Sequence, residues 1–232
     1  MFLSQAQVLQ GDYGRMFLDG LRMTLALAVC AWLLAMTLAL VLVSVRLGGR
    51  PWVERAVAAY VAYHRNVPTL VQLMMWYFGI PALFSTGMQV WLAARDTEFV
   101  LAVIALALCQ AAYFSEDIRT GLRALPPGQM EAARSLGLGE VGALRHVILP
   151  QALRHALPAL LNNSILLFKN TSLAMAIGLA ELTYATREIE NQSFLTFACY
   201  LVATVLYLAC CLVLMAGGRW LDRRYRVAGA RP

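Results

Sequence analysis

Polar side chains interrupt a long apolar run near its middle, where they could hold a polar solute. Lys169, Asn170, Thr171 and Ser172 stand together within the stretch Ala156–Leu179. A charged side chain at the centre of a bilayer costs roughly 2.5–3.5 kcal/mol on insertion scales, so such residues usually face a cavity or a partner. A lysine in an interrupted helix could bind a carboxylate. The four residues are candidates for a substrate pathway; the alternative is a helix packed on another chain, with Lys169 paired to an acid.

Two further polar groups lie at the ends of apolar stretches. Asn66, Thr69 and Gln72 surround Pro68, which lacks an amide hydrogen and should kink a helix there. Glu116 lies at the end of another run. We count these residues as candidate substrate-pathway positions. The competing interpretation is a structural kink around Pro68 and a local ion pair at Glu116.

The composition requires a membrane to position these residues. The 232 residues are 60% hydrophobic and only 14% charged, against about 45–50% and about 25% in soluble domains. The apolar runs are continuous rather than alternating, which favours helices over a barrel. We therefore predict an all-α integral membrane protein with five transmembrane helices. The expected spans cover residues 21–45, 64–84 (completed in its second half), 99–114, 156–179 and 194–216.

The distribution of arginine predicts the orientation. Arginines follow the first, third and fifth spans, at positions 46, 50 and 55; 119, 123, 134, 145 and 154; and 219, 223, 224, 226 and 231. Loops rich in Lys and Arg stay cytoplasmic. We expect an external segment over residues 1–20, a membrane domain over 21–217 and a basic cytoplasmic tail over 218–232. The net charge of +6 then reflects loops beside anionic lipid rather than nucleic-acid binding.

The longest cytoplasmic loop, residues 126–150, contains its own helical pattern. Two prolines at 126 and 127 favour a helix start, and Gly137 and Gly139 should end that helix. A second short helix is expected from Glu140 to Ile148, stopped by Pro150. Ala132 and Ala133 leave one face without bulk, so that a partner surface could approach. The pattern predicts a helix–turn–helix knob.

The spacing within this loop resembles a known signature. Glu131-Ala132-Ala133, three residues, Gly137, nine residues and then Val147–Pro150 are similar to the EAA motif of ABC importer permeases, which more often has isoleucine where Val147 stands. The stretch Arg65–Pro81, "PPGQMEAARSLGL", "ILPQALRHALPALLN" and "KNTSLAMAIGLAEL" look like the branch for polar amino acids, and within it like permeases for glutamate and aspartate. The likeness covers residues 18–226.

The resemblance implies a fold and a set of partners. It implies the type I importer permease core of five helices, with the loop as the cytoplasmic coupling helix. The ATPase-coupling residues would be Glu131, Ala132, Ala133, Gly137, Leu149 and Pro150. The partners would be a second permease chain (a paralogue favoured, or an identical copy), two copies of an ABC ATPase and a periplasmic or lipid-anchored amino-acid-binding protein. The location would be the bacterial inner membrane, among its lipids.

The sequence lacks the groups that nucleotide chemistry would need. A phosphate-binding loop has the pattern GxxxxGK[ST], but the single lysine, Lys169, follows "LLF". His64, His146 and His155 are scattered, without metal-ligand spacing. We therefore expect a subunit that is not an enzyme by itself and has no cofactor of its own, with ATP and magnesium held by the partner ATPase.

One external segment could contact the binding protein. Glu181, Arg187 and Glu188 fall in the stretch Glu181–Gln192, which is expected to be a polar loop on the outer side. The alternative is a merely solvated loop. For the whole chain, the rival function is a stand-alone secondary transporter or channel for small polar solutes. Such a protein would have the spans and the intramembrane polar groups, but no reason for the coupling-loop spacing.

Overall fold

Long apolar helices without proline set the shape of the molecule. The computed structural model describes residues 11–225, and it has no strand within that range. Three helices are long and apolar enough to cross a membrane: α2 (Gly11–Leu47), α6 (Thr97–Arg123) and α11 (Thr196–Tyr225). A fourth span is possible if the bent pair Glu140–Ile177 and Leu182–Ser193, which meet at 50°, is taken as one.

Shorter elements connect these helices. They are α3 (Pro51–Asn66), α4 (Thr69–Met74), a π-helical turn (Met75–Gly79), a 3-10 turn (Ile80–Leu83), α5 (Thr86–Ala93), α7 (Gln129–Ser135), α8 (Glu140–Ala143), a second π-helical turn (Leu144–Ile148), α9 (Leu149–Asn170), a 3-10 segment (Thr171–Ile177) and α10 (Leu182–Ser193). The expected second span is therefore built from several short pieces, of which Thr69–Leu83 is an apolar helix shorter than a full span.

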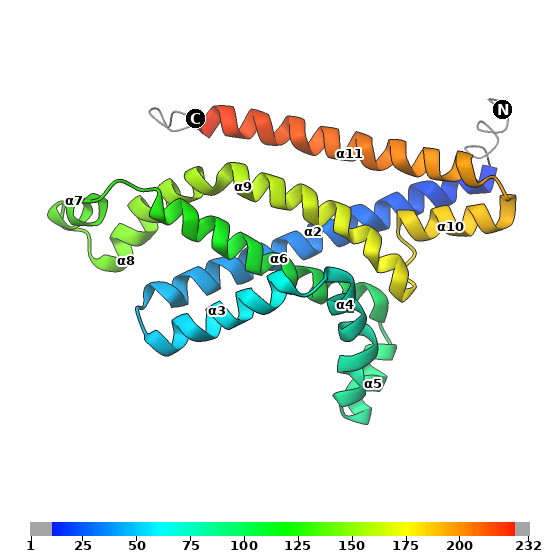
Figure 1. The fold of residues 1–232 in the computed structure, drawn as a ribbon, viewed down its shortest axis with the longest axis horizontal. Helices are drawn as coiled ribbons and strands as arrows, with labels where there is room; N and C mark the ends of the chain where they lie inside the picture. Colours follow the sequence, from blue (N-terminus) through cyan, green and yellow to red (C-terminus); the bar gives the residue numbers. More distant parts are fainter. Residues whose placement is uncertain (1–10, 226–232) are drawn as a thin grey trace.

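Different helices lie at the two ends of the molecule. In Figure 1, α7, α8, the turn between α2 and α3 and the C-terminal end of α11 lie at one end, and α10 lies at the other. The helix α5 projects away from the bundle. The described arginines that follow the first, third and fifth spans therefore belong to elements that meet at one end, the end that also carries residues 126–150. Below, this is called the loop end.

Alanine-rich helix faces form the core. The helix α6 packs against both α2 and α9, and small side chains let helices in membranes approach closely. On α2 the fully buried residues Ala31, Ala35 and Ala39 recur every fourth position, and on α6 they face Ala105, Ala107 and Ala111. At Gly121 of α6, the helices α6 and α9 approach so closely that an added Cβ would stand 2.2 Å from the carbonyl oxygen of Ala152 in α9.

Two proline expectations need correction. At Pro68 the chain does not kink within one helix: Val67 is extended (φ −95°, ψ 131°), and a new helix starts at Thr69, because the residue before a proline avoids the helical region. Pro150 does not stop the second loop helix; it follows the π-helical turn Leu144–Ile148 directly, and the helix continues through it as α9. Residues 11–20 of the expected external segment are helical and begin α2.

Other parts of the expectations changed or lie outside the described range. The stretch expected to be a polar loop from Glu181 is the helix α10, and residues 218–225 of the basic tail are the end of α11. Residues 1–10 and 226–232, including Arg226 and Arg231, lie outside the described residues. The expected interruption at Lys169–Ser172 is confirmed, since α9 ends at Asn170 and a 3-10 segment follows.

Candidate functional site

The loop end carries a helix–turn–helix, as the sequence predicted. The helix α7 starts after Gly128 and ends at Leu136, and Gly137 then takes φ +84°, a backbone conformation that glycine adopts without strain. The amide of Gly137 donates to the Arg134 carbonyl at 2.9 Å, and that of Leu138 donates to Ala133 at 3.2 Å. These bonds satisfy carbonyls at the helix end and fix the turn into α8.

The exposed face of this loop differs from the expected one. Glu131 and Ala132 are exposed, but Ala133 is only 2% exposed and packs inside the loop. Ala133 therefore does not offer a small surface to a partner. Instead, two apolar side chains that the sequence analysis did not single out, Leu136 (83% exposed) and Val141 (78% exposed), stand out from the loop. Exposed apolar side chains mark a protein contact surface where they form a contiguous patch.

The loop is joined directly to the substrate-pathway candidates. The elements α8, the π-helical turn Leu144–Ile148 and α9 follow one another without a break, so one helical run extends from Glu140 to Asn170. Leu149 and Pro150 are half-buried at the start of α9. Gln151 donates to the side chain of Gln129 in α7 at 3.2 Å. The knob is thus tied to the base of a helix that reaches Lys169.

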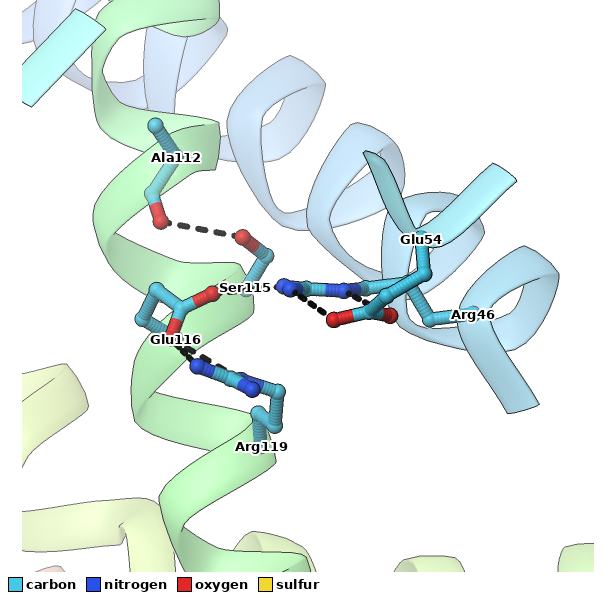
Figure 2. Close-up of polar contacts among 6 residues, drawn as sticks. All are labelled: Arg46, Glu54, Ala112, Ser115, Glu116 and Arg119. Carbon is cyan, nitrogen blue, oxygen red and sulfur yellow. Dashed lines mark hydrogen bonds and ion pairs between the residues drawn. The ribbon is translucent and has the colours of Figure 1, made fainter. Parts of the chain in front are cut away.

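An ion-pair network joins three helices beside the loop (Figure 2). Arg46 at the end of α2 donates two hydrogen bonds to Glu54 of α3, at 2.9 and 2.7 Å, and one to Glu116 of α6 at 2.6 Å. Arg119 donates two more to the second oxygen of Glu116, at 2.9 and 2.6 Å. Two guanidinium groups balance two carboxylates, and charge-assisted, partly bidentate bonds of this kind are the strong ones.

This network agrees with the second of the two interpretations of Glu116, a local ion pair. Both of its oxygens are engaged by arginines, and its side chain is 15% exposed, so the structure favours the local ion pair over a free carboxylate on a pathway. The sequence analysis missed the pair Arg46–Glu54. It could have been recognised from an arginine at the end of an apolar run that is followed by a glutamate in the first turn of the next helix.

The polar group around Pro68 is divided between two environments. Gln72 is buried; its amide donates to the carbonyls of Val67 at 2.7 Å and His64 at 3.1 Å, and its oxygen faces the His64 ring. Gln72 therefore holds the break between α3 and α4 together. Thr69 contacts the thiol of Cys109. Asn66 is exposed and lines a cleft on the other side of α3.

The interrupted helix brings two of its four polar residues to a second cleft. Lys169 and Ser172 line a cleft of about 490 Å³ between α9 and α11, together with Tyr207 and Cys211. Within residues 11–225, no carboxylate lies within ion-pair distance of Lys169. Thr171 is turned inward and fully buried, and donates to the Phe168 carbonyl at 2.6 Å; Asn170 is half-buried at the end of α9.

At the opposite end, Glu181 does not reach the surface as expected. Its side chain is fully buried, because it caps the start of α10: it accepts from the amides of Thr183 at 2.9 Å and Tyr184 at 2.8 Å and from the Tyr207 hydroxyl at 2.9 Å. Arg187 is exposed on α10, and Glu188 is half-buried and accepts from Gln192. Only the latter two remain candidates for an external contact. Tyr207 was missed because nothing in its sequence neighbourhood marks it.

Comparisons with known proteins give one consistent family. The model of the binding-protein-dependent transport system inner membrane component matches residues 31–227. The arginine ABC transporter permease protein ArtQ of Haemophilus influenzae is 33% identical over 216 residues, 92% of this chain and 95% of that protein. The glutamate/aspartate import permease protein GltJ of Escherichia coli (strain K12) is 29% identical over 233 residues, 99% and 95% of the two chains.

A solved structure shares the fold. A chain in the crystal structure of an amino acid ABC transporter with histidines has a TM-score of 0.81 and 32% sequence identity, and the likeness covers 97% of this chain and 98% of that one. The family match includes residues 126–150 and the three long apolar helices from residue 31 on. The chain belongs to the family of inner membrane components of binding-protein-dependent transport systems.

Proposed function

We propose that this chain is the membrane permease subunit of an ATP-driven importer for polar amino acids. The observation that carries the proposal is the helix–turn–helix of residues 126–150, with its exposed Glu131, Leu136 and Val141, at the start of the helical run that ends at Lys169. The relatives named above are permeases of arginine and of glutamate/aspartate systems. These amino acids differ in side-chain charge but share the α-carboxylate.

The partners follow from the same proposal. A separate ATPase, present in two copies and holding ATP and magnesium, docks on the loop. A second permease chain, a paralogue or an identical copy, completes the pathway, and a binding protein delivers the amino acid at the end that carries α10. The N-terminus is external and the C-terminus cytoplasmic, because the basic helix ends gather at the loop end. The five-span topology belongs to this proposal, with α3 and the apolar helix Thr69–Leu83 together forming the second span.

The mechanism is alternating access driven through one helix. Closure of the ATPase pair on ATP moves α7 and α8. Because residues 140–170 form one helical run, about 45 Å long at 1.5 Å per residue, displacement of the loop tilts α9 and changes the cleft at Lys169. The Lys169 ammonium would bind a carboxylate of the passing amino acid, and it favours acidic substrates because it carries no ion pair of its own. Such switching requires two arrangements of the helices that the ATPase biases.

The experiment that tests the proposal is co-purification from mild detergent. Tagged chain, expressed with its native neighbours, is captured and its companions are identified by mass spectrometry. The proposal predicts an ATPase and a permease chain in the eluate, and loss of the ATPase from the Leu136→Asp and Val141→Asp variants. Recovery of the chain alone, with no ATPase in the native sample, contradicts it.

A further inference from the structure

A basic cleft lies between α2, α3 and α6, apart from the Lys169 cleft. It has a volume of about 440 Å³, and its polar lining comes from Arg46, Arg65, Asn66, Glu116 and Arg119, with Tyr113 as an aromatic wall. Three guanidinium groups thus surround one carboxylate. Basic pockets between membrane helices on the cytoplasmic side bind anionic lipid headgroups.

One of the three arginines is left without an acid. Arg46 and Arg119 are engaged by Glu54 and Glu116, as described above. Arg65 instead lies over the Tyr113 ring, with its guanidinium carbon 5.4 Å from the ring centre, and within residues 11–225 it has no carboxylate within 4 Å. Asp117, which feels the charge of Arg65 electrostatically, accepts a hydrogen bond from Asn163 instead. Arg65 is therefore the one arginine of the cleft lining whose guanidinium has no carboxylate within 4 Å in residues 11–225, and a cation–π contact holds it in place.

The surroundings of Arg65 suit a lipid rather than a soluble anion. The wall of the cleft on α3 is apolar and small, formed by Ala58, Val61 and Ala62. Tyr63, two residues before Arg65, is 40% exposed, and tyrosine is enriched at the level of lipid headgroups. A phospholipid could therefore place its phosphate at Arg65 while its acyl chains stay on apolar surface.

We propose that this cleft is a binding site for the phosphate of an anionic glycerophospholipid, with Arg65 as its principal ligand. The planar guanidinium donates two parallel hydrogen bonds to the phosphate oxygens, a geometry that the ammonium of a lysine cannot reproduce. Bound there, the lipid bridges α3 and α6 beside the Arg46–Glu116 pair. The assignment to the cytoplasmic leaflet rests on the proposed orientation, whereas the cleft and its ligand do not depend on the transported substrate or on an ATPase.

The test measures lipid binding to the isolated full-length chain by native mass spectrometry. Palmitoyl-oleoyl phosphatidylglycerol is titrated against phosphatidylcholine with the same acyl chains. Arg65→Gln is expected to weaken phosphatidylglycerol binding roughly tenfold, as for loss of one charge-assisted hydrogen bond, and to reduce the preference for phosphatidylglycerol over phosphatidylcholine, whose phosphate is accompanied by a choline cation. Arg65→Lys should lie between the two. The matched control is Arg55→Gln on the same helix, an exposed arginine that does not line the cleft. Its phosphatidylglycerol affinity should change by less than about threefold, as expected for a screened surface charge.

Two outcomes overturn the proposal. Equal phosphatidylglycerol affinity in the native chain and in folded Arg65→Gln removes Arg65 as a ligand. Displacement of the lipid by millimolar free glutamate at constant ionic strength assigns the cleft to a soluble carboxylate. Either result leaves the importer assignment untouched, because the measurement involves neither ATP nor transport, and a melting curve of each variant shows whether it has folded.

Discussion

Gly121 of α6 and Ala152 of α9 cross so closely that a Cβ on Gly121 would lie 2.2 Å from the Ala152 carbonyl oxygen. The obstacle is backbone, which cannot move aside as a flexible side chain could. This crossing fixes α9, and with it Lys169, relative to the central helix.

Gly121→Ala should therefore separate α6 from α9 and destabilise the chain. Overpacking of a close contact costs about 1–3 kcal/mol, which should appear as a lower melting temperature in detergent. Gly217→Ala in α11 is the matched control, because a Cβ there meets nothing within 4 Å. Equal melting temperatures of the two variants would contradict the observed crossing.

Breaking the network at Arg46 should cost more than breaking an exposed ion pair. Arg46→Gln leaves the nearly buried Glu116 with one partner fewer, and we expect a loss of about 1–3 kcal/mol. The pair Arg22–Asp19, whose side chains are 78% and 69% exposed, provides the control: Arg22→Gln should change stability by less than about 1 kcal/mol. Chemical unfolding in detergent gives both values, and a smaller effect at Arg46 than at Arg22 would argue against the network.

Substitutions at Glu181 and Arg187 should have different effects, because Glu181 has a structural role in α10 and Arg187 is a candidate contact residue. Glu181→Ala removes a buried cap and should lower stability by about 1–2 kcal/mol. Arg187→Ala, at an exposed position, should leave the melting temperature unchanged but weaken stimulation of ATP hydrolysis by the binding protein. If Glu181→Ala melts like the native chain, the side chain does not cap α10 as described.

Lys169 should affect uptake without affecting folding. In proteoliposomes containing the assembled transporter and its binding protein, Lys169→Gln should lower kcat/KM for glutamate by roughly tenfold or more, as for loss of a charge-assisted bond. Lys169→Arg keeps the charge and should retain much of the uptake. Uptake by Lys169→Gln equal to that of the native chain would remove Lys169 from the proposed pathway.

Local pattern was enough to predict the long apolar helices of the first, third and fifth spans, the change of helix type after Asn170 and the turn at Gly137. Each depends on apolar length or on a backbone preference of residues adjacent in sequence. The continuation of the helix through Pro150 was not predicted, because a proline reads equally as a stop or as a first-turn residue. Its place is decided by the π-helical turn that precedes it.

The positions that the sequence could not assign depend on packing between distant segments. Ala133 was expected to face a partner, but it is buried within its own loop. Glu181 was expected outside, but it is enclosed by α10 and by Tyr207 from α11. Glu116 was a candidate for a pathway or for a local ion pair, and the sequence could not show that Arg46, seventy residues earlier, completes the pair. The two glutamates have the same sequence signature, a charged residue near an apolar run, although one caps a helix and the other joins an ion-pair network.

The most direct test of the central claim compares two glycines of the same loop turn in the reconstituted transporter. Gly137 has φ +84°, whereas Gly139 has φ −67° and open space around it, so Gly137→Val should distort the turn and Gly139→Ala should not. Transported amino acid per ATP hydrolysed is the quantity to measure. The proposed lever predicts that this ratio falls at least tenfold in Gly137→Val, with the chain still in the membrane, and is unchanged in Gly139→Ala. A native ratio in a folded Gly137→Val transporter would contradict the claim that this loop transmits the work of the ATPase.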